Sequence, residues 1–240
     1  MFVASGNVRR NRVLASLAAD DFALLQQYLQ PTGLKVRQCV EVVNREIDAV
    51  YFPYTGIISM IVHSNNRQHQ SEVGLIGHEG MTGLPVVLGT ERAYCCGCVQ
   101  VEGDGVCVPA HSLRKLMQAS SSLRLSLLRY VHAFVMQTIH TALANARGKV
   151  EQRLARWLLM AHDRLPGDDL RLTHEFLALM LGVRRAGVTI ALHQLQSAGQ
   201  ITITRGAIVI VDRPGLEQSA GGFYGVPERE LERLLELRAP

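Results

Sequence analysis

The residues of this chain with the clearest chemical potential are two adjacent arginines, Arg184 and Arg185, which follow Gly182-Val183. They open the second of two short segments in which apolar residues recur at helical spacing. An arginine at the start of a helix can donate paired hydrogen bonds to a guanine edge or contact a phosphate. This residue type in this position therefore indicates contact with a nucleic acid.

Cysteines are the second chemically active group, since Cys95, Cys96 and Cys98 lie almost side by side. In a strand, Cys96 and Cys98 face one side and Cys95 the other, and no second paired motif supplies four metal ligands. We expect small buried thiols and no metal site here. A redox-sensing thiol group made by the three cysteines is the alternative.

Patterns that support catalysis are missing from the sequence. A cupin-like metalloenzyme needs a close pair of histidines with a glutamate, whereas His63, His69 and His78 are widely spread. There is no Walker A motif and no nucleophile elbow around a serine. We therefore expect no catalytic residues and no enzyme activity, with a cupin-like β-roll metalloenzyme as the alternative outside regulation.

The composition is that of a globular chain with a small positive charge. Its 240 residues are 48% hydrophobic, and 25 Lys and Arg against 21 Asp and Glu give a net charge of +4. Residues 1–21 show no signal peptide, and no run approaches the roughly 18 apolar residues of a membrane span. We expect a cytoplasmic protein without a membrane partner, whose basic surplus is compatible with a polyanion.

The N-terminal half is predicted to be mostly strands. Residues 8–30 indicate short helices, which Pro31 and Gly33 end. Residues 35–109 contain short runs rich in Val, Ile, Cys and Tyr, separated by Gly, Pro, Asn and Asp. Such regular short strands predict an antiparallel sandwich or barrel.

One long helix is predicted over Ser120–Ala146, which contains no Pro or Gly. Its apolar residues cover two adjacent stripes, so the helix can pack on its own domain and also present a seam to a second copy. A helix buried wholly within one subunit is the alternative. The residues expected at the dimer interface are Leu127, Val131, Phe134, Val135, Thr138 and Ala142.

The two segments that flank Gly182-Val183 together indicate a helix-turn-helix. Thr173 suits an N-cap for the helix His174–Leu181, and Gly182 can take the positive φ that ends it. A second helix is predicted over Arg184–Ser197, followed by the hairpin ITITRGAIVIVD. Two helices, their turn and a hairpin together predict a winged helix, whose second helix can lie in the DNA major groove.

Positive charge gathers in the same region. Between residues 147 and 213 there are 10 Lys and Arg and 6 Asp and Glu, so the excess of 10 − 6 = +4 equals that of the whole chain. A helix pair used only for packing would have its arginines in salt bridges or scattered. Arginines at the start of the second helix favour double-stranded DNA as the partner.

With these elements in place, the chain resembles the Crp/Fnr superfamily of bacterial transcription regulators. The stretches that carry the resemblance are Gly74–Gly89, Val150–Leu165, Leu172–Val183 and Arg184–Ser197. The resemblance implies a homodimer on palindromic DNA, RNA polymerase as a further partner, and a small-molecule effector of unidentified chemistry. It also implies an N-terminal sensory domain with the shape of a cyclic-nucleotide-binding jelly roll.

The expected fold class is therefore α+β. We expect an N-terminal antiparallel β-roll (jelly roll) sensory domain over residues 1–119 and a dimerisation helix with hinge over 120–147. A winged helix-turn-helix domain should occupy 148–222, and a helical tail 223–240.

The resemblance also assigns roles on the second helix. Aligned on Gly182, the family's Ser-Arg-Glu run becomes Arg184, Arg185 and Ala186, and a later family Arg becomes Ile190. The base-reading Arg is thus kept at Arg185, while the Glu and the second Arg are lost, which should change the sequence that is read. The residues expected to contact DNA are Thr173, Arg184, Arg185, Thr189, His193 and Arg205.

The effector site departs from the family pattern as well. Nucleotide-binding members carry Gly-Glu and, about ten residues later, Arg-Ser/Thr-Ala, but here Arg92 lies thirteen residues after Glu79. A Gly-rich turn with an arginine can still hold an anion, or the two residues can simply close a turn. We therefore expect no cofactor and no ordinary cyclic-nucleotide site. The candidate ligand-binding residues are Gly77, Glu79, Gly80, Thr82, Arg92 and Ala93.

Overall fold

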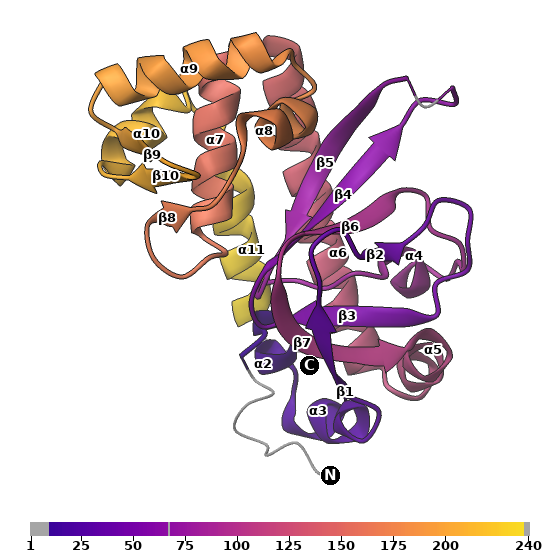
Figure 1. The fold of residues 1–240 in the computed structure, drawn as a ribbon. Coiled ribbons are helices and arrows are strands. Elements are labelled where there is room, and N and C mark those ends of the chain that lie inside the picture. The colour runs from indigo at the N-terminus through magenta and orange to yellow at the C-terminus, as the bar shows by residue number, and fades with distance from the viewer. Residues whose placement is uncertain (1–9, 67, 238–240) are drawn as a thin grey trace. The chain divides into compact units, whose positions relative to one another are not determined.

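The computed structural model describes residues 10–66 and 68–237 and divides into two compact units (Figure 1). Unit 1 comprises residues 1–60, 76–136 and 229–240, and unit 2 comprises 61–75 and 137–228. The expectations about a signal peptide and about the helical tail fall partly on residues 1–9 and 238–240, which lie outside the described residues.

The N-terminal half of the chain forms antiparallel sheets, as the pattern of short strands predicts; most of their strands belong to unit 1, and residues 61–75 belong to unit 2. One sheet has the order β1-β7-β3 and another the order β2-β6-β4-β5. Fully buried side chains such as Phe52, Ile58 and Val108 form the core between the elements. The strands are β1 (Gln30–Leu34), β2 (Cys39–Glu41), β3 (Ala49–Pro53), β4 (Ile57–His63), β5 (Gln70–Ile76), β6 (Cys96–Val101) and β7 (Gly103–Pro109).

The strand β1 is missing from the sequence prediction, which took Pro31 and Gly33 as the end of a helical region. Both residues lie in β1, where Pro31 is opposite Val106 and Gly33 is opposite Asp104 of β7. A proline cannot donate to a central ladder but is tolerated at a sheet edge. Because β1 is an edge strand, its Pro and Gly are compatible with strand pairing.

In the described part, two short helices precede β1, one lies between β5 and β6, and two directly follow β7. Asn11 caps α2 by accepting a hydrogen bond from the Leu14 amide (3.2 Å), and it donates to the carbonyls of Pro53 (2.9 Å) and Gly80 (2.7 Å). This buried amide therefore anchors the first helix to the roll. The helices of this part are α2 (Arg12–Ser16), α3 (Ala19–Gln26), α4 (Leu84–Val87), α5 (Ala110–Ala119) and α6 (Ser121–Arg147).

The long helix α6 buries one apolar stripe and exposes the other. Leu127, Val131 and Phe134 are 0%, 6% and 5% exposed. They pack inside their own unit, and their place in a dimer interface stays a prediction. The exposed stripe consists of Leu128 (36%), Val135 (46%), Ile139 (54%) and Leu143 (48%). Of the other predicted interface residues, Thr138 is half-buried and Ala142 is exposed.

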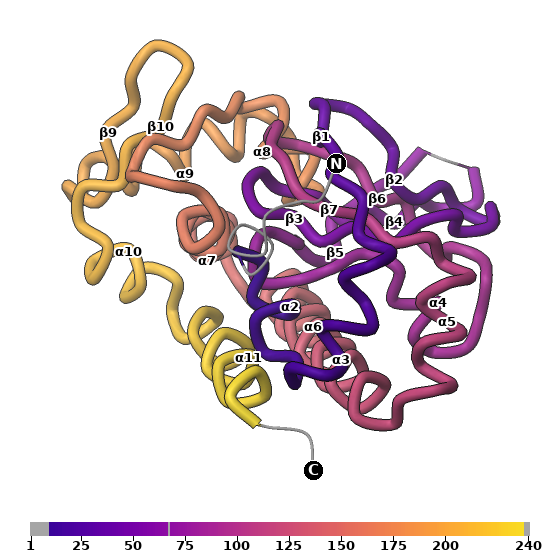
Figure 2. Tube along the Cα trace, turned by 90° about the horizontal axis from the view of Figure 1, so that it is seen from below, coloured from indigo at the N-terminus to yellow at the C-terminus, as the bar shows by residue number. Residues whose placement is uncertain are grey.

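The last helix, α11 (Val226–Glu236), packs against the N-terminal elements of unit 1 through its later residues. In Figure 2 these last turns (yellow) lie next to α2 (indigo), and the Arg12 guanidinium is paired with the Glu232 carboxylate. Arg129 of α6 donates to the Leu237 carbonyl (2.8 Å), and His132 lies 3.4 Å from Glu230. Side-chain pairing therefore fixes this end of the chain.

Unit 2 consists of small helices around a sheet of order β8-β10-β9. Its core is formed by fully buried leucines and valines, among them Leu158, Leu177 and Val188. The two-residue strand β8 is absent from the sequence prediction, which took Pro166–Asp169 as a turn. The elements are α7 (Val150–His162), β8 (Asp169–Leu170), α8 (His174–Leu181), α9 (Arg185–Ser197), β9 (Ile201–Thr204), β10 (Ala207–Ile210) and α10 (Arg213–Ser219).

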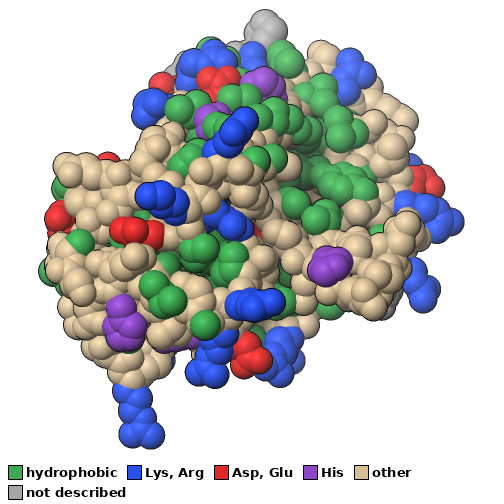
Figure 3. Space-filling view, turned by 90° about the horizontal axis from the view of Figure 1, so that it is seen from above, with side chains coloured by type: hydrophobic (Ala, Val, Ile, Leu, Met, Phe, Trp, Pro, Cys, Tyr) green, Lys and Arg blue, Asp and Glu red, His purple; other side chains and the backbone are tan. Residues whose placement is uncertain are grey.

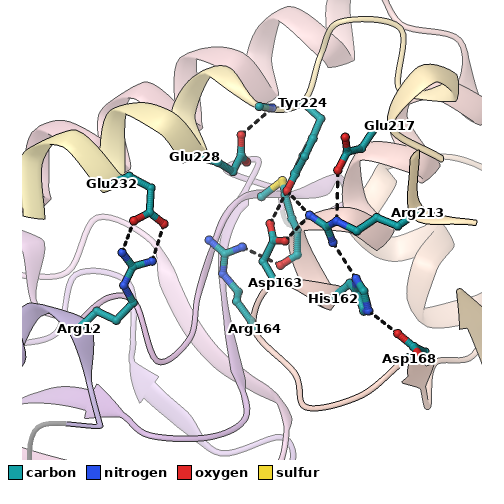
Figure 4. A network of polar contacts seen from close by, with 12 residues as sticks. Arg12, His162, Asp163, Arg164, Asp168, Arg213, Glu217, Tyr224, Glu228 and Glu232 are labelled. Carbon is teal, nitrogen blue, oxygen red and sulfur yellow. Dashed lines mark hydrogen bonds and ion pairs between the residues drawn. The ribbon is translucent and has the colours of Figure 1, made fainter. Parts of the chain in front are cut away.

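A polar network joins the end of α7 to the segments that contain Arg213 and Tyr224 (Figure 4). Arg213 donates to the carboxylate of Asp163 (2.7 Å) and to the hydroxyl of Tyr224 (2.6 Å), and Tyr224 donates to the other Asp163 oxygen (2.8 Å). Burial, followed by the charge of Asp163, raises the pKa of Tyr224, which therefore stays a donor at neutral pH. This arginine stabilises the fold.

Candidate nucleic-acid interface

The turn between α8 and α9 has the geometry that the sequence predicts. Thr173 caps α8 by accepting from the Phe176 amide (3.1 Å), and Gly182 ends the helix with φ +62°. The two helices are bent by 106° relative to each other, within the roughly 90–120° of a DNA-binding helix-turn-helix. No single helix in the described part is long and apolar enough to cross a membrane; only α8 and α9 together reach that length and composition.

Helix α9 has one buried and one exposed face. Val188, Leu192 and Leu195 are fully buried, as predicted, and hold the helix on the core of unit 2. The opposite face is exposed and contains no acidic side chain, so it suits a polyanion. Its residues are Arg185, Ala186, Ile190, His193 and Gln194.

The two arginines enter this face from different backbone positions. Arg184 is the N-cap with extended backbone, and Arg185 is the first helical residue, so the helix begins one residue later than predicted. Both side chains are exposed. Within residues 10–66 and 68–237 neither one forms an ion pair, in contrast to a helix pair that serves packing alone.

Two further predicted contact residues lie along the same helix. His193 is exposed, while Thr189 is half-buried and donates its hydroxyl proton to the Arg185 carbonyl (3.2 Å). The His174 ring nitrogen Nδ1 lies 3.1 Å from the same hydroxyl. Because these internal hydrogen bonds occupy the Thr189 hydroxyl, its methyl group is the part left to face a ligand.

Ile190 was not among the predicted contact residues, although the structure exposes 60% of it in the middle of this face. Helical spacing contains the signal, since Ile190 lies four residues after Ala186 and three before His193. In the sequence, Ile190 stands out only as the residue that replaces the family's second arginine.

The hairpin β9–β10 presents the last predicted contact. Thr204 and Ala207 are register partners, so Arg205 and Gly206 form the tip, and Gly206 has φ +87°. A positive φ of this size favours glycine at the second tip position. Arg205 is exposed there without an ion pair among the described residues.

Four of the ten basic residues between 147 and 213 stabilise the fold. Arg153, Arg156 and Arg164 donate to backbone carbonyls, and Arg213 is paired with acids. The remaining six are exposed. Figure 3 shows basic side chains on this face, some of them beside acidic ones, among neutral and hydrophobic side chains. The six exposed residues are Arg147, Lys149, Arg171, Arg184, Arg185 and Arg205.

The predicted effector residues are engaged with their own chain. The Glu79 carboxylate accepts from the Gly77 amide (3.1 Å), and Thr82 accepts from the Tyr51 amide (2.9 Å). Arg92 donates to the Asn44 carbonyl (2.8 Å) beside the buried Ala93. A Cβ at Gly80 would lie 2.1 Å from the Tyr130 hydroxyl. These contacts give each residue a structural role, and an effector site here stays a prediction.

Comparison with known proteins gives a domain match for part of the chain and a fold for most of it. Residues 152–219 match the profile of the Crp-like helix-turn-helix domain. No curated protein matches the sequence significantly.

Several solved structures share the fold of the chain. A protein described as a Crp/Fnr-family transcriptional regulator from Eubacterium rectale has a TM-score of 0.69 and 17% identity, covering 89% of this chain and 100% of its own. FixK2 from Bradyrhizobium japonicum has a TM-score of 0.67 and 16% identity, covering 79% and 96%. The c-di-GMP-responsive regulator CLP from Xanthomonas campestris has a TM-score of 0.63 and 18% identity, covering 80% and 99%.

Proposed function

From the Crp-like helix-turn-helix domain that residues 152–219 form, we propose that this protein is a transcription regulator that binds double-stranded DNA as a homodimer at palindromic sites. The observation that carries the proposal is the exposed face of α9, which begins with two arginines that form no ion pair in the described part. The exposed Arg205 at the hairpin tip supports it. Each of these arginines pairs with phosphates or bases at little cost to the fold.

The two arginines are assigned different tasks on DNA. Arg185 starts the helix, so its side chain can reach a guanine edge when α9 lies in the major groove. Arg184 leaves the chain from the extended turn, and we assign it to a phosphate, as we do Arg205. A bidentate base contact contributes roughly 1–3 kcal/mol of discrimination, whereas a phosphate contact contributes affinity without sequence information.

The middle of α9 presents apolar atoms where the family pattern has charged ones. Ala186 and Ile190 are exposed, and apolar side chains in the major groove contact the methyl group of thymine. We infer that this protein reads thymine at the positions that a glutamate and a second arginine read in other members.

The exposed stripe of α6 is the proposed dimer interface. Leu128, Val135, Ile139 and Leu143 repeat at seven-, four- and four-residue spacing and are exposed by 36% to 54%. A continuous apolar seam of this kind is typical of helices that pair with a second copy. A symmetric dimer would present two α9 helices to two half-sites about one or more DNA turns apart.

A signal sensed in the N-terminal roll is the remaining part of the proposal. CLP is described as responsive to c-di-GMP, which shows that a protein of this fold can respond to a nucleotide. Here the internal hydrogen bonds of Glu79 and Arg92 argue against ordinary cyclic AMP or cyclic GMP binding. Isothermal calorimetry with either nucleotide at millimolar concentration should therefore show no specific heat.

Operator selection from a random DNA pool tests the function. The wild-type chain should select a palindrome, and Arg185→Ala should flatten the preference at one symmetric pair of positions. Arg184→Ala should weaken binding to all sequences alike and make the salt dependence shallower by about one phosphate contact per subunit. Arg45→Ala, which removes an exposed arginine in unit 1, is the matched control and should change neither property. Absence of any selected sequence with the wild-type chain would refute the proposal.

A further inference from the structure

Three thiols from two strands meet at the edge of the sheet β2-β6-β4-β5. Cys39 of β2 is the register partner of Cys98 of β6. Burial first, and then the neighbouring Cys39 thiol, raise the pKa of both Cys96 and Cys98. Cys39 is exposed, and Cys96 and Cys98 are half-buried, so small solutes can reach the group.

This arrangement changes the grouping that the sequence predicts. Cys95 is 1% exposed and lies on the other side of the strand, as alternation requires, so it does not join Cys96 and Cys98. Cys39, 57 positions from Cys96 along the chain, takes its place because β2 pairs with β6. The interpretation as buried thiols fits Cys95, whereas Cys96 and Cys98 are only half-buried. Among the described residues, no group of three or more His, Cys, Asp and Glu could hold a metal ion.

The register brings Cys39 and Cys98 close enough for a covalent bond. Directly opposed residues in an antiparallel pair have Cα atoms roughly 4.5–5.5 Å apart, and disulfides span roughly 4.4–6.8 Å. Both cysteines are free in the structure. The pairing of β2 with β6 therefore places the two thiols side by side, next to a register shift between Cys39 and Glu41.

We propose that Cys39 and Cys98 form a reversible disulfide within one chain when the protein meets a hydroperoxide. Cys39 first loses its proton, and its thiolate attacks one oxygen of hydrogen peroxide. The O–O bond breaks, and the leaving hydroxide takes up the released proton to become water. The resulting sulfenic acid is attacked by the Cys98 sulfur, so that the S–S bond forms and the sulfenic oxygen leaves as water with the Cys98 proton. Two thiols lose two electrons, and one hydrogen peroxide becomes two waters.

Exposure decides which sulfur reacts first. Burial raises the pKa of Cys98 and raises the pKa of Cys96 to about 12, so both are almost fully protonated at neutral pH. Cys39 is the exposed member of the group, which makes it the one that a peroxide reaches. Cys96 also lies near Cys39, so one thiol–disulfide exchange could move the bond from Cys98 to Cys96.

Peptide mapping of the full chain tests the proposal. The protein is treated with a small excess of hydrogen peroxide, alkylated and digested with trypsin without reduction. Cleavage after Arg37, Arg45, Arg92 and Arg114 places Cys39 in peptide 38–45 and Cys98 in peptide 93–114. We expect these two peptides to be linked, with the mass of their sum less two hydrogen atoms. Fragmentation should locate the bond at Cys98, and dithiothreitol should release it.

Matched variants identify the sulfurs. Cys39→Ser should lose the linked peptide, and Cys95→Ser, which removes the buried neighbour, should retain it. The proposal is wrong if Cys39 remains alkylated in oxidised protein, if the bond joins two chains on non-reducing electrophoresis, or if fragmentation places it at Cys96. The wild-type map gives these outcomes even if a variant fails to fold. Because the readout is a mass, its result is independent of DNA binding.

Discussion

Ile190 is the exposed apolar side chain in the middle of the outer face of α9. Its side chain is 60% exposed on a helix whose other branched residues face the core. If it contacts a thymine methyl, Ile190→Ala should weaken the preference for thymine at one symmetric pair of operator positions by roughly 1 kcal/mol. Val211→Ala, at an equally exposed site (63%) outside the helix, is the control. Competition titrations with base-substituted operators measure the difference, and equal effects of the two variants would contradict the assignment.

Glu41 is a buried carboxyl group with an incomplete set of partners. Its Oε1 accepts from the Gly83 amide (2.7 Å), while Oε2 is buried without a hydrogen bond in the described structure. Burial raises the pKa of Glu41 above its ordinary value of 4.5. The folded state therefore favours the protonated form, and the stability that this gives is present below pH 4.5 and lost as the pH rises through the folded pKa.

Glu41→Gln tests this sign. Glutamine keeps an oxygen for the Gly83 amide and removes the charge, so the variant should gain stability relative to the wild type as the pH increases from 4.5 to neutral. Urea unfolding at several pH values gives the free energy of unfolding for both proteins. Parallel curves would show that the carboxyl group ionises equally easily in the folded and unfolded states.

At the scale of elements, α6 has one face that packs in the core of unit 1 and one exposed face that we propose as the dimer interface. Val131 is 6% exposed and packs in unit 1, whereas Val135 and Ile139 are exposed. Replacing Val135 and Ile139 together by Glu should therefore yield folded monomers, which sedimentation velocity and circular dichroism can establish. Val131→Glu should instead lower the free energy of unfolding by several kcal/mol, because it buries an unpaired charge. A folded dimer from the double variant would place the interface elsewhere.

Two glycines of the helix-turn-helix should respond in opposite ways to alanine. Gly187 lies inside α9 with open space around it, so Gly187→Ala should raise the free energy of unfolding by roughly 0.5–1 kcal/mol. Gly182 has φ +62°, so Gly182→Ala should lower it by about 1 kcal/mol. Chemical denaturation measures both. A loss of stability in Gly187→Ala would mean that its apparent free space is filled.

What the sequence predicts well is local, and what it misses depends on pairing between distant segments. Thr173 and Gly182 mark the ends of α8 because capping and positive φ are properties of a few neighbouring residues. The strand β1 (Gln30–Leu34) cannot be predicted from its own residues, because their strand conformation depends on pairing with β7. Helical spacing finds both stripes of α6 but does not say which one the roll buries. For the same reason, Cys39 is found beside Cys98 only once the strand register is known.

For the whole molecule, the net charge of +4 says little about the charge available to DNA. Six basic residues between 147 and 213 are exposed, and the rest of that set is used inside the fold. Since each phosphate contact contributes about −0.9 to the slope of log affinity against log salt, a dimer should show a slope no steeper than about −11. Titrations at several salt concentrations measure it. A steeper slope would show that arginines outside this region also bind DNA.

The hydrogen bond between Trp157 and Glu72 makes the fluorescence of Trp157 sensitive to the local conformation. Trp157 is the single tryptophan of the chain, is 4% exposed, and donates its indole N–H to the Glu72 carboxylate (2.8 Å). The ring of Phe176 in α8 meets it edge-on at 5.6 Å. One fluorophore thus touches both the β4–β5 hairpin and α8, the helix that precedes α9. Its emission colour and its quenching by solutes can follow, without any added label, whether an effector, an oxidant or an operator loosens that contact.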